Sequence, residues 1–241
     1  MADIHLVHLY HDLMNIYGDR GNILTLALRC RWRNISIRIS EISLREDLPL
    51  DTDVLFFGGG QDQQQEIVSH NLQEKKESFT KLAHSGVVML AICGGYQLLG
   101  KFYKPHHGED LPGVGVLDIE TVAGNTRMIG NCVVAWEKQT LVGFENHSGK
   151  TYLGRKAKPL GEVLIGHGNN GEDFTEGAVS QNIFGCYLHG SLLPKNPRFA
   201  DMLITRALER KTKKKVLLPP LSDRIEEEAH RSAVKRARQT K

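Results

Sequence analysis

Cys93 and His189 are the two residues whose chemical types and positions along the chain favour covalent chemistry. Cys93 ends the apolar run 87–92 and is followed by two glycines and a helix-like run. This order is typical of a strand buried on both faces that turns sharply into a helix. Free N–H groups and the positive dipole end of that helix would favour a thiolate. A cysteine that merely closes a core strand is the commoner case, so both interpretations stay open on position alone.

His189 ends a second strand-like segment, 183–188. If this strand joins the same sheet, His189 emerges at the same carboxyl edge as Cys93, where open α/β sheets bind their ligands. A cysteine and a histidine that meet there are the pattern of a thiolate nucleophile with an imidazole base. A third group usually orients such a histidine, but residues 190–193 are neutral. The sequence therefore predicts a Cys–His pair without an adjacent acid.

Three consecutive glycines, 58–60, follow a buried strand predicted over 53–57. Backbone N–H groups in such a segment can approach a phosphate or the oxyanion of a tetrahedral intermediate. No phosphate-binding glycine pattern is present, which favours the oxyanion, with the N–H groups of Gly60 and Gly94 as donors. Arg127 is a lone cation among small and apolar residues, and an arginine so placed commonly binds a carboxylate.

The order of predicted elements positions these residues. By residue 100 the chain has repeated strand, loop and helix three times, which predicts a parallel sheet with right-handed crossovers. The first helix is expected over 23–31, with Asp19 among its capping residues, and a single helix is expected over 61–85. Residues 101–152 change to short strand-like pieces, 114–120, 131–136 and 141–144, which indicate an inserted antiparallel ribbon. We predict an α/β, flavodoxin-like domain over 1–210 and a charged tail over 211–241 that forms a surface helix or stays loose.

Composition excludes several other classes of protein. The chain has 241 residues, 24% of them charged, and a formal net charge of +3. Much of the basic excess lies in the tail, so no nucleic-acid binding is predicted. The four cysteines are far apart without a C-x-x-C pair, so neither a metal site nor a disulfide framework is predicted. No stretch is apolar enough to span a bilayer and no signal peptide is evident, so we expect a cytoplasmic protein.

The assembled motifs resemble those of the class I glutamine amidotransferases, in the branch of the cobyric acid synthases. Within that branch they are most similar to the glutaminase subunits of lipid II isoglutaminyl synthases. The resemblance implies the class I glutamine amidotransferase fold, Cys93 as nucleophile and His189 as base. It also implies that Arg127 and Gln97 contact substrate, and it implies no cofactor in this chain. The matching segments are 13–22, 57–62, 93–100, 143–147 and 187–190.

This resemblance implies a reaction and a partner. Cys93 would attack the side-chain amide of L-glutamine, form a γ-glutamyl thioester and release ammonia. A Mur-ligase-like subunit of the MurT type, in a heterodimer with this chain, would use ATP and Mg²⁺ to amidate the D-glutamate α-carboxyl of lipid II. Two alternatives stay open: a glutaminase that serves a cobyric-acid-type or other synthetase, and a non-catalytic flavodoxin-like binding protein.

The chain departs from the class I pattern at Ser191, because other class I enzymes carry a glutamate two residues after the histidine. We therefore predict that the partner contributes an Asp or Glu across the interface. Glu145 and Glu176 are the candidates for an internal acid instead.

Overall fold

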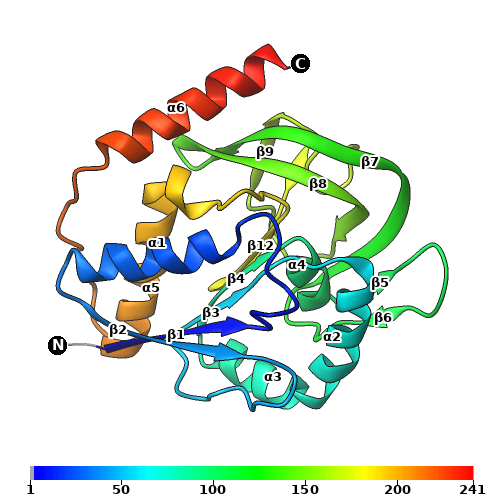
Figure 1. Cartoon of the computed structure of the whole chain (residues 1–241), viewed down its shortest axis with the longest axis horizontal. Coiled ribbons are helices and arrows are strands. Elements are labelled where there is room, and N and C mark those ends of the chain that lie inside the picture. Colours follow the sequence, from blue (N-terminus) through cyan, green and yellow to red (C-terminus); the bar gives the residue numbers. More distant parts are fainter. Residues whose placement is uncertain (1–2, 241) are drawn as a thin grey trace.

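The structure is a computed structural model that describes residues 3–240, and it contains two β-sheets flanked by helices (Figure 1). The first sheet has the strand order β11-β12-β4-β3-β1-β2. All its neighbouring pairs are parallel except β11 with β12. The order 2-1-3-4, extended by β12, is that of flavodoxin-like folds, so the predicted α/β architecture is confirmed. Its strands are β1 (Asp3–Leu9), β2 (Ser36–Ile42), β3 (Val54–Phe57), β4 (Val88–Ile92), β11 (Ala178–Ser180) and β12 (Ile183–Cys186).

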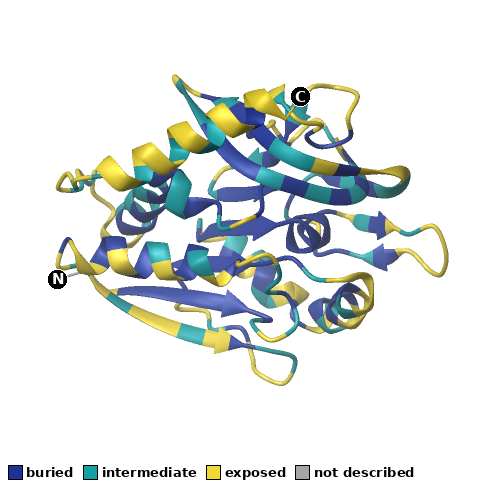
Figure 2. Cartoon of the chain, turned by 45° about the horizontal axis from the view of Figure 1, so that its top comes forward, coloured by how far each residue is buried: buried dark blue, intermediate teal, exposed yellow. Residues whose placement is uncertain are grey.

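The core lies around the central strands of this sheet. All residues of β3, β4 and β12 are buried, as their unbroken apolar runs predict (Figure 2). The strand order reverses between β1 and β3, and ligands of such sheets bind beyond the carboxyl ends of the strands at this point. The helices that connect the strands are α1 (Arg20–Arg31), α2 (Asp62–Glu74), α3 (Lys76–His84) and α4 (Gly94–Leu99).

The single helix predicted over 61–85 is wrong, because α2 ends at Glu74 and α3 starts at Lys76. Lys75 lies between them with φ −91° and ψ 0°, and its Nζ donates hydrogen bonds to the carbonyl oxygen of Leu44 and to Asn71 Oδ1. The contact with Leu44 comes from tertiary structure, which the helical periodicity of the segment does not reveal.

The second sheet contains the predicted antiparallel ribbon. Its strand order is β10-β9-β7-β5-β6, and β8 pairs with β7 as a long antiparallel hairpin. The short pieces predicted for this region are wrong in length, because β7 and β8 continue through polar residues and change register between Ala123 and Met128. The strands are β5 (Phe102–Lys104), β6 (Leu111–Pro112), β7 (Ile119–Trp136), β8 (Gln139–Leu153), β9 (Gly161–Ile165) and β10 (Thr175–Glu176).

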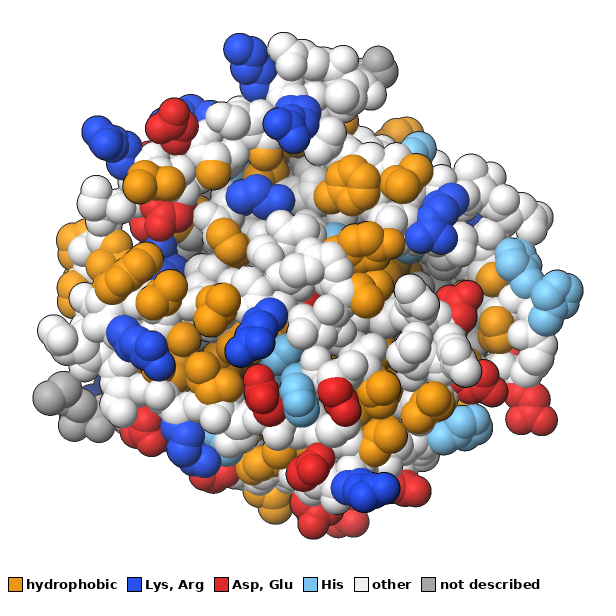
Figure 3. Space-filling model, viewed as in Figure 1, with side chains coloured by type: hydrophobic (Ala, Val, Ile, Leu, Met, Phe, Trp, Pro, Cys, Tyr) orange, Lys and Arg blue, Asp and Glu red, His pale blue; other side chains and the backbone are white. Residues whose placement is uncertain are grey.

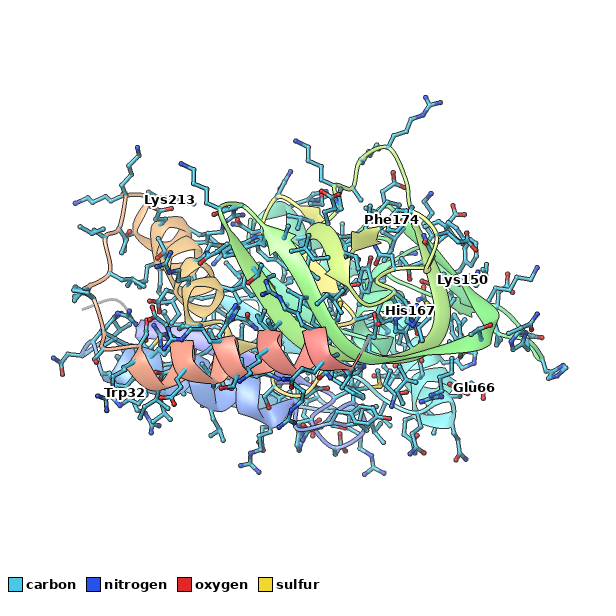
Figure 4. All side chains as sticks on the ribbon, turned by 90° about the horizontal axis from the view of Figure 1, so that it is seen from above. Trp32, Glu66, Lys150, His167, Phe174 and Lys213 are labelled. Atoms are coloured by element: carbon cyan, nitrogen blue, oxygen red, sulfur yellow. The ribbon has the colours of Figure 1, made fainter. Side chains whose placement is uncertain are left out.

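The C-terminal segment forms two helices after a short turn η1 (Leu193–Lys195): α5 (Pro197–Thr212) and α6 (Arg224–Gln239). The domain boundary predicted at 210/211 therefore lies inside α5. Of the two alternatives for the tail, the charged helix forms, and it crosses over the β7–β8 hairpin (Figures 1 and 4). Ala237 is buried there against Val133 and Val142, so α6 covers apolar surface of the ribbon.

Arg29 joins the C-terminal segment to the body of the protein. Its side chain is 1% exposed, and its guanidinium donates to both carboxylate oxygens of Asp201 on α5, at 2.7 and 2.8 Å. It also donates to Asp223, the residue before α6, at 2.7 Å. Arg33 on the following helical turn bonds Asp201 and the carbonyl of Pro219. A buried guanidinium with two carboxylates is a well-compensated charge and fixes α1, α5 and the start of α6 together.

Two surface properties bear on function. Among residues 3–240 no helix has both the length and the apolar character that a bilayer crossing requires. On the face shown in Figure 3, acidic and basic side chains are interspersed, and apolar side chains gather over α1. Leu24, Leu28 and Trp32, at intervals of four residues, are 50%, 41% and 54% exposed on one face of that helix.

Candidate active site

Cys93 occupies a strained turn between β4 and α4. Its backbone has φ 51° and ψ −110°, outside the regions that residues with a Cβ normally adopt. Strain of this kind persists only where the surroundings enforce it. Here Gly95 donates its N–H to the carbonyl of Gly58 at 3.1 Å, and a Cβ on Gly95 would lie 2.5 Å from the carbonyl oxygen of Phe57. The turn at Cys93 is thus held against the triple-glycine segment 58–60. The predicted position of Cys93, on a turn between a strand and a helix, is confirmed.

His189 follows β12 and lies close to the same segment. A Cβ placed on Gly59 would lie 3.3 Å from the Cβ of Cys93 and 3.3 Å from Cε1 of His189. The backbone of His189 is fixed by two hydrogen bonds with Phe144 of β8, at 2.8 and 3.2 Å. Because β12 is the parallel neighbour of β4, the fold brings the two predicted residues to one edge of the sheet.

The protonation states of the pair differ from those that the sequence favours. Burial, followed by the negative charge of Asp19, raises the pKa of the Cys93 thiol to about 12, although the Gly94 N–H and Arg127 oppose this shift. The expected dipole of α4 is weak, because the helix has only six residues. Burial also lowers the pKa of His189 to about 4. The resting site therefore holds a neutral thiol and a neutral imidazole.

The ring of His189 has no orienting acid within residues 3–240. The residue is 1% exposed, and neither ring nitrogen has a hydrogen-bond partner in this part of the chain. Glu145 instead accepts hydrogen bonds from the backbone N–H groups of His167 and Gly168. Glu176 accepts one from Tyr187 N–H at 2.6 Å. Both candidates for an internal acid are therefore engaged elsewhere.

Asp19 is a site residue that the sequence analysis assigned wrongly. Its side chain makes no capping hydrogen bond to α1; Oδ2 instead accepts the N–H of Gly59 at 2.7 Å. Burial raises the pKa of this carboxyl to about 7. The contact fixes the triple-glycine segment, and no hydrogen bond from the N–H of Gly60 occurs within residues 3–240. That N–H is available to an oxyanion.

A cavity of about 450 Å³ opens beside Cys93. Its volume suits a small polar molecule. Gly60, Gln97 and Arg127 of the predicted site line it together with Cys93, whereas His189 and Gly94 are buried beside it. The other lining residues are Ile16, Tyr17, Gln61, Asp62, Gln63, Gln65, Tyr103, Asn146, His147, Ser148 and Gly149.

The side chain of Gln97 is already bonded at both ends. Its Oε1 accepts from Gln65 at 2.7 Å, and its Nε2 donates to the hydroxyl of Tyr187 at 3.0 Å. That hydroxyl also lies 2.7 Å from the hydroxyl oxygen of Thr151. Gln97 thus joins α4 to α2 and to the segment that follows β12. A direct contact with substrate stays a prediction.

Arg127 supplies a positive charge at the ribbon side of the cavity. Its Nε donates to Asn146 Oδ1 at 2.6 Å, and Asn146 in turn donates to the hydroxyl of Tyr17 at 2.7 Å. This leaves the terminal nitrogens of the guanidinium for a carboxylate, the group that an arginine fork fits best.

Replacing Arg127 by alanine is expected to raise the KM for glutamine by roughly 10- to 150-fold, since a charge-assisted hydrogen bond contributes about 1.5–3 kcal/mol. Steady-state ammonia release measures this. Lysine at the same position should restore part of the affinity, because it keeps the positive charge. The recovery should be incomplete, because lysine lacks the planar guanidinium that binds a carboxylate through two hydrogen bonds. Arg155→Ala, on an exposed residue outside the cavity lining, is the control and should not change KM. An unchanged KM for Arg127→Ala would remove Arg127 from the site.

Glu176 makes stability depend on pH. Burial raises the pKa of this carboxyl from 4.5 to about 8. Its contribution to folding stability is therefore complete below about pH 4.5 and is lost as the pH rises through about 8. Glu176→Gln cannot ionise, so the variant should lose less stability over this range, by on the order of 4–5 kcal/mol for this shift at about 1.36 kcal/mol per pKa unit. Urea unfolding at pH 5 and pH 8.5 measures it, and equal pH slopes for both proteins would contradict the assignment.

No group of three His, Cys, Asp or Glu side chains in the part of the chain that the structure describes is arranged to hold a metal ion. The site therefore consists of an elbow cysteine, a histidine from the neighbouring strand, a glycine segment with a free N–H group and an arginine across a small cavity. On an α/β sheet of this order, these features suit the attack of a thiol on the carbonyl carbon of a small polar molecule.

Comparisons with known proteins give the family. The domain model of the CobB/CobQ-like glutamine amidotransferases matches residues 5–197, and the chain belongs to this family. The chain is 41% identical over 93% of its length to subunit GatD of the lipid II isoglutaminyl synthase (glutamine-hydrolyzing) of Streptococcus pneumoniae, of which it covers 88%. It is 40% identical to the subunit of the same name from Staphylococcus aureus, with 88% of this chain and 87% of the relative covered.

Solved structures agree on the fold. PurLQS from Thermotoga maritima superposes with a TM-score of 0.64 at 14% identity, over 88% of this chain and 100% of that chain. The glutaminase domain of Trypanosoma brucei CTPS with bound acivicin gives a TM-score of 0.55 at 10% identity, over 90% of this chain and 96% of that chain. The class I glutamine amidotransferase fold inferred from the motifs is confirmed.

Proposed function

We propose that this chain is the glutaminase subunit of a lipid II isoglutaminyl synthase. It hydrolyses L-glutamine and delivers ammonia to a Mur-ligase-like synthetase subunit. The main observation that supports glutamine hydrolysis is the position of Cys93 and His189. Both lie close to Gly59, beside a cavity that Arg127 also lines. Similarity of about 40% over nearly the full length to two subunits of that named enzyme supports the choice of acceptor.

The reaction follows from the groups in the cavity. Neutral His189 removes the proton from the Cys93 thiol while the sulfur attacks the side-chain amide carbon of glutamine. The N–H groups of Gly60 and Gly94 stabilise the resulting oxyanion. The imidazolium then protonates the amide nitrogen, the C–N bond breaks, and ammonia leaves a γ-glutamyl thioester on Cys93. Water hydrolyses this thioester to glutamate and regenerates the thiol.

The partner subunit completes the enzyme in this proposal. It binds ATP and Mg²⁺, activates the α-carboxyl of D-glutamate in the lipid II stem peptide and receives the ammonia. It also supplies the carboxylate that His189 lacks.

The exposed apolar face of α1 supports such a contact, because large apolar surface patches mark protein interfaces. The helix begins next to the site, where the ring of Tyr17 lies 4.9 Å from that of His189. Because the proposed reaction uses ATP, we propose that it runs in the cytoplasm, at the inner face of the membrane that carries the lipid-linked substrate.

Neither alternative has comparable support. The cobyric acid synthase of Desulforamulus reducens is 34% identical over 65% of this chain, which covers only 34% of that longer protein. A non-catalytic binding protein would be expected to have lost its nucleophile or base, and both Cys93 and His189 are in place.

The function is tested by following the amide nitrogen of glutamine. The chain is co-expressed with its Mur-ligase-like partner, and the complex is incubated with amide-¹⁵N glutamine, ATP, Mg²⁺ and lipid II. Mass spectrometry should find one ¹⁵N in the D-isoglutamine of the stem peptide. Glutamine hydrolysis without lipid II amidation, together with amidation of a corrinoid carboxylate, would instead favour the cobyric-acid-type acceptor.

A further inference from the structure

Tyr17 connects two parts of the candidate site. Its ring centroid lies 4.9 Å from that of His189, at an interplanar angle of 64°, which is an edge-to-face arrangement. Its hydroxyl accepts a hydrogen bond of 2.7 Å from Nδ2 of Asn146 on β8. Oδ1 of the same Asn146 accepts a hydrogen bond of 2.6 Å from Nε of Arg127 on β7. One side chain thus contacts the predicted base and, through Asn146, the predicted substrate-binding cation.

The contact with the His189 ring matters because neither nitrogen of that ring has a hydrogen-bond partner within residues 3–240. Packing therefore sets the direction of the ring in this part of the chain. Among the same residues, Tyr17 is the only aromatic partner of His189. Edge-to-face pairs favour particular geometries and contribute more than the area they bury. The contact also leaves both ring nitrogens free, so it is compatible with an acid supplied by the partner.

The backbone at Tyr17 is held in an unusual conformation. Its φ is 54°, in the left-handed region that a bulky residue rarely adopts. The N–H of Ile16 donates to the carbonyl oxygen of Gly59 at 3.3 Å. The carbonyl oxygen of Gly18 accepts a hydrogen bond from the hydroxyl of Ser191. Tyr17 is thus fixed between the triple-glycine segment and the segment that follows β12, and strain of this kind persists where the surroundings enforce it.

Folding stability is a poor explanation for these contacts. Tyr17 is 46% exposed, and it lines the cavity together with Asn146 and Arg127. Because water competes for an exposed hydroxyl, one hydrogen bond there adds little to the free energy of unfolding. The strained backbone and the two contacts therefore act on the cavity and not on the core.

We propose that Tyr17 is a positioning residue for glutamine hydrolysis. Its ring holds the imidazole of His189 in the direction that proton transfer from Cys93 requires. Its hydroxyl holds Asn146 and, through it, the guanidinium of Arg127. One side chain then sets both the group that acts on the amide and the group that binds the carboxylate of glutamine. This inference rests on the proposed glutaminase activity.

The test separates the ring from the hydroxyl, in the complex of the full chain with its synthetase subunit. Tyr17→Phe keeps the ring and removes the hydroxyl. We expect its KM for glutamine to rise roughly three- to tenfold, the equivalent of one hydrogen bond, with kcat within about twofold of the wild type. Tyr17→Leu removes the ring as well. Its kcat should therefore also fall roughly tenfold, the equivalent of a strong aromatic pair.

Tyr152 is the matched control. It is 41% exposed, its hydroxyl bonds Glu172, and it does not line the cavity. Tyr152→Phe and Tyr152→Leu should change neither KM nor kcat. A wild-type kcat for Tyr17→Leu, or a wild-type KM for Tyr17→Phe, would overturn the proposal. So would equal losses of kcat in both Tyr17 variants, because the ring would then have no role of its own.

Asn146 tests the connection to Arg127. Asn146→Ala should raise KM about as much as Tyr17→Phe, again with little change in kcat. The double variant should have a KM no higher than that of the weaker-binding single variant, because both substitutions break the same connection. Multiplied effects on KM would show that the two residues act independently and would contradict the proposed connection.

NMR of the histidine-labelled full chain separates the possible failures. If the wild-type complex hydrolyses no glutamine, the proposed function is wrong, and the His189 ring signals still test the ring contact. These signals, assigned with His189→Ala, should be single in the wild type and in Tyr17→Phe, and broadened or doubled in Tyr17→Leu. If Tyr17→Leu does not fold, a nuclear Overhauser effect between the two rings of the wild type decides. Its absence, or identical signals in all three proteins, overturns the proposal.

Discussion

Cys93→Ala is expected to reduce glutamine hydrolysis by the complex to the uncatalysed background, a loss of roughly 10⁴-fold or more, as when a nucleophile is removed from other catalytic triads. No thioester can form without the sulfur, and residues 3–240 place no other cysteine in the lining of the cavity. The same complex should still amidate its acceptor when ammonium salts are supplied, because that step does not use Cys93. Ammonia release and ammonium-dependent amidation measure the two activities separately.

Cys30 provides the control for this substitution. It is a fully buried cysteine on α1 whose thiol pKa burial also raises to about 12, and it does not line the cavity. Cys30→Ala should retain full glutaminase activity. A Cys93→Ala complex that still hydrolyses glutamine would refute the thioester mechanism and leave the cavity without a nucleophile.

The isolated chain is expected to be a poor glutaminase, and addition of the synthetase subunit should raise the turnover about a hundredfold, the contribution of a well-positioned general base. The reason lies in the His189 ring, whose two nitrogens have no partner within the described chain. A histidine without an orienting acid loses orders of magnitude in rate in other triads. Turnover of the chain alone and in the complex measures the difference.

The competing hypothesis of an internal acid has its own controls. Glu145→Gln and Glu176→Gln should each leave the ratio between the two turnover numbers unchanged, because both carboxyls bind backbone N–H groups and not His189. Replacement of one Asp or Glu at the partner's interface should instead reduce turnover in the complex to that of the isolated chain. Equal turnover with and without the partner would refute the hypothesis that the partner supplies the acid that orients His189.

Much of the site was predictable because its strands are buried on both faces. Runs such as 54–57 and 87–92 have no polar residue that could face water, so their place in a parallel sheet and the exit of Cys93 at its edge follow from the pattern. His189 follows in the same way from the apolar β12. Local sequence carries this information because Cys93 directly follows β4 and His189 comes shortly after the end of β12.

The residues that were missed depend on contacts between distant segments. Asp19 looks like a helix cap, and only the fold brings Gly59 to its carboxylate across 40 positions of sequence. His147 lies in the matching segment 143–147, but the sequence assigned it no role, and its stack on Tyr187 depends on a contact between distant parts of the chain. Arg29 likewise reads as one more charge on a helix until Asp201 and Asp223 are brought to it.

The position of α6 has a consequence for the order in which the molecule is completed during synthesis. The ribosome finishes β7 and β8 well before it makes residues 224–239, so Val133 and Val142 are exposed while the rest of the chain is being translated. Apolar surface left open in this way favours aggregation. The carboxylate of Asp223 also reaches Arg29 only at the end, which leaves that guanidinium half-compensated until then. A polypeptide released before residue 223 would carry both defects permanently, so its accumulation in the cell should depend on chaperones.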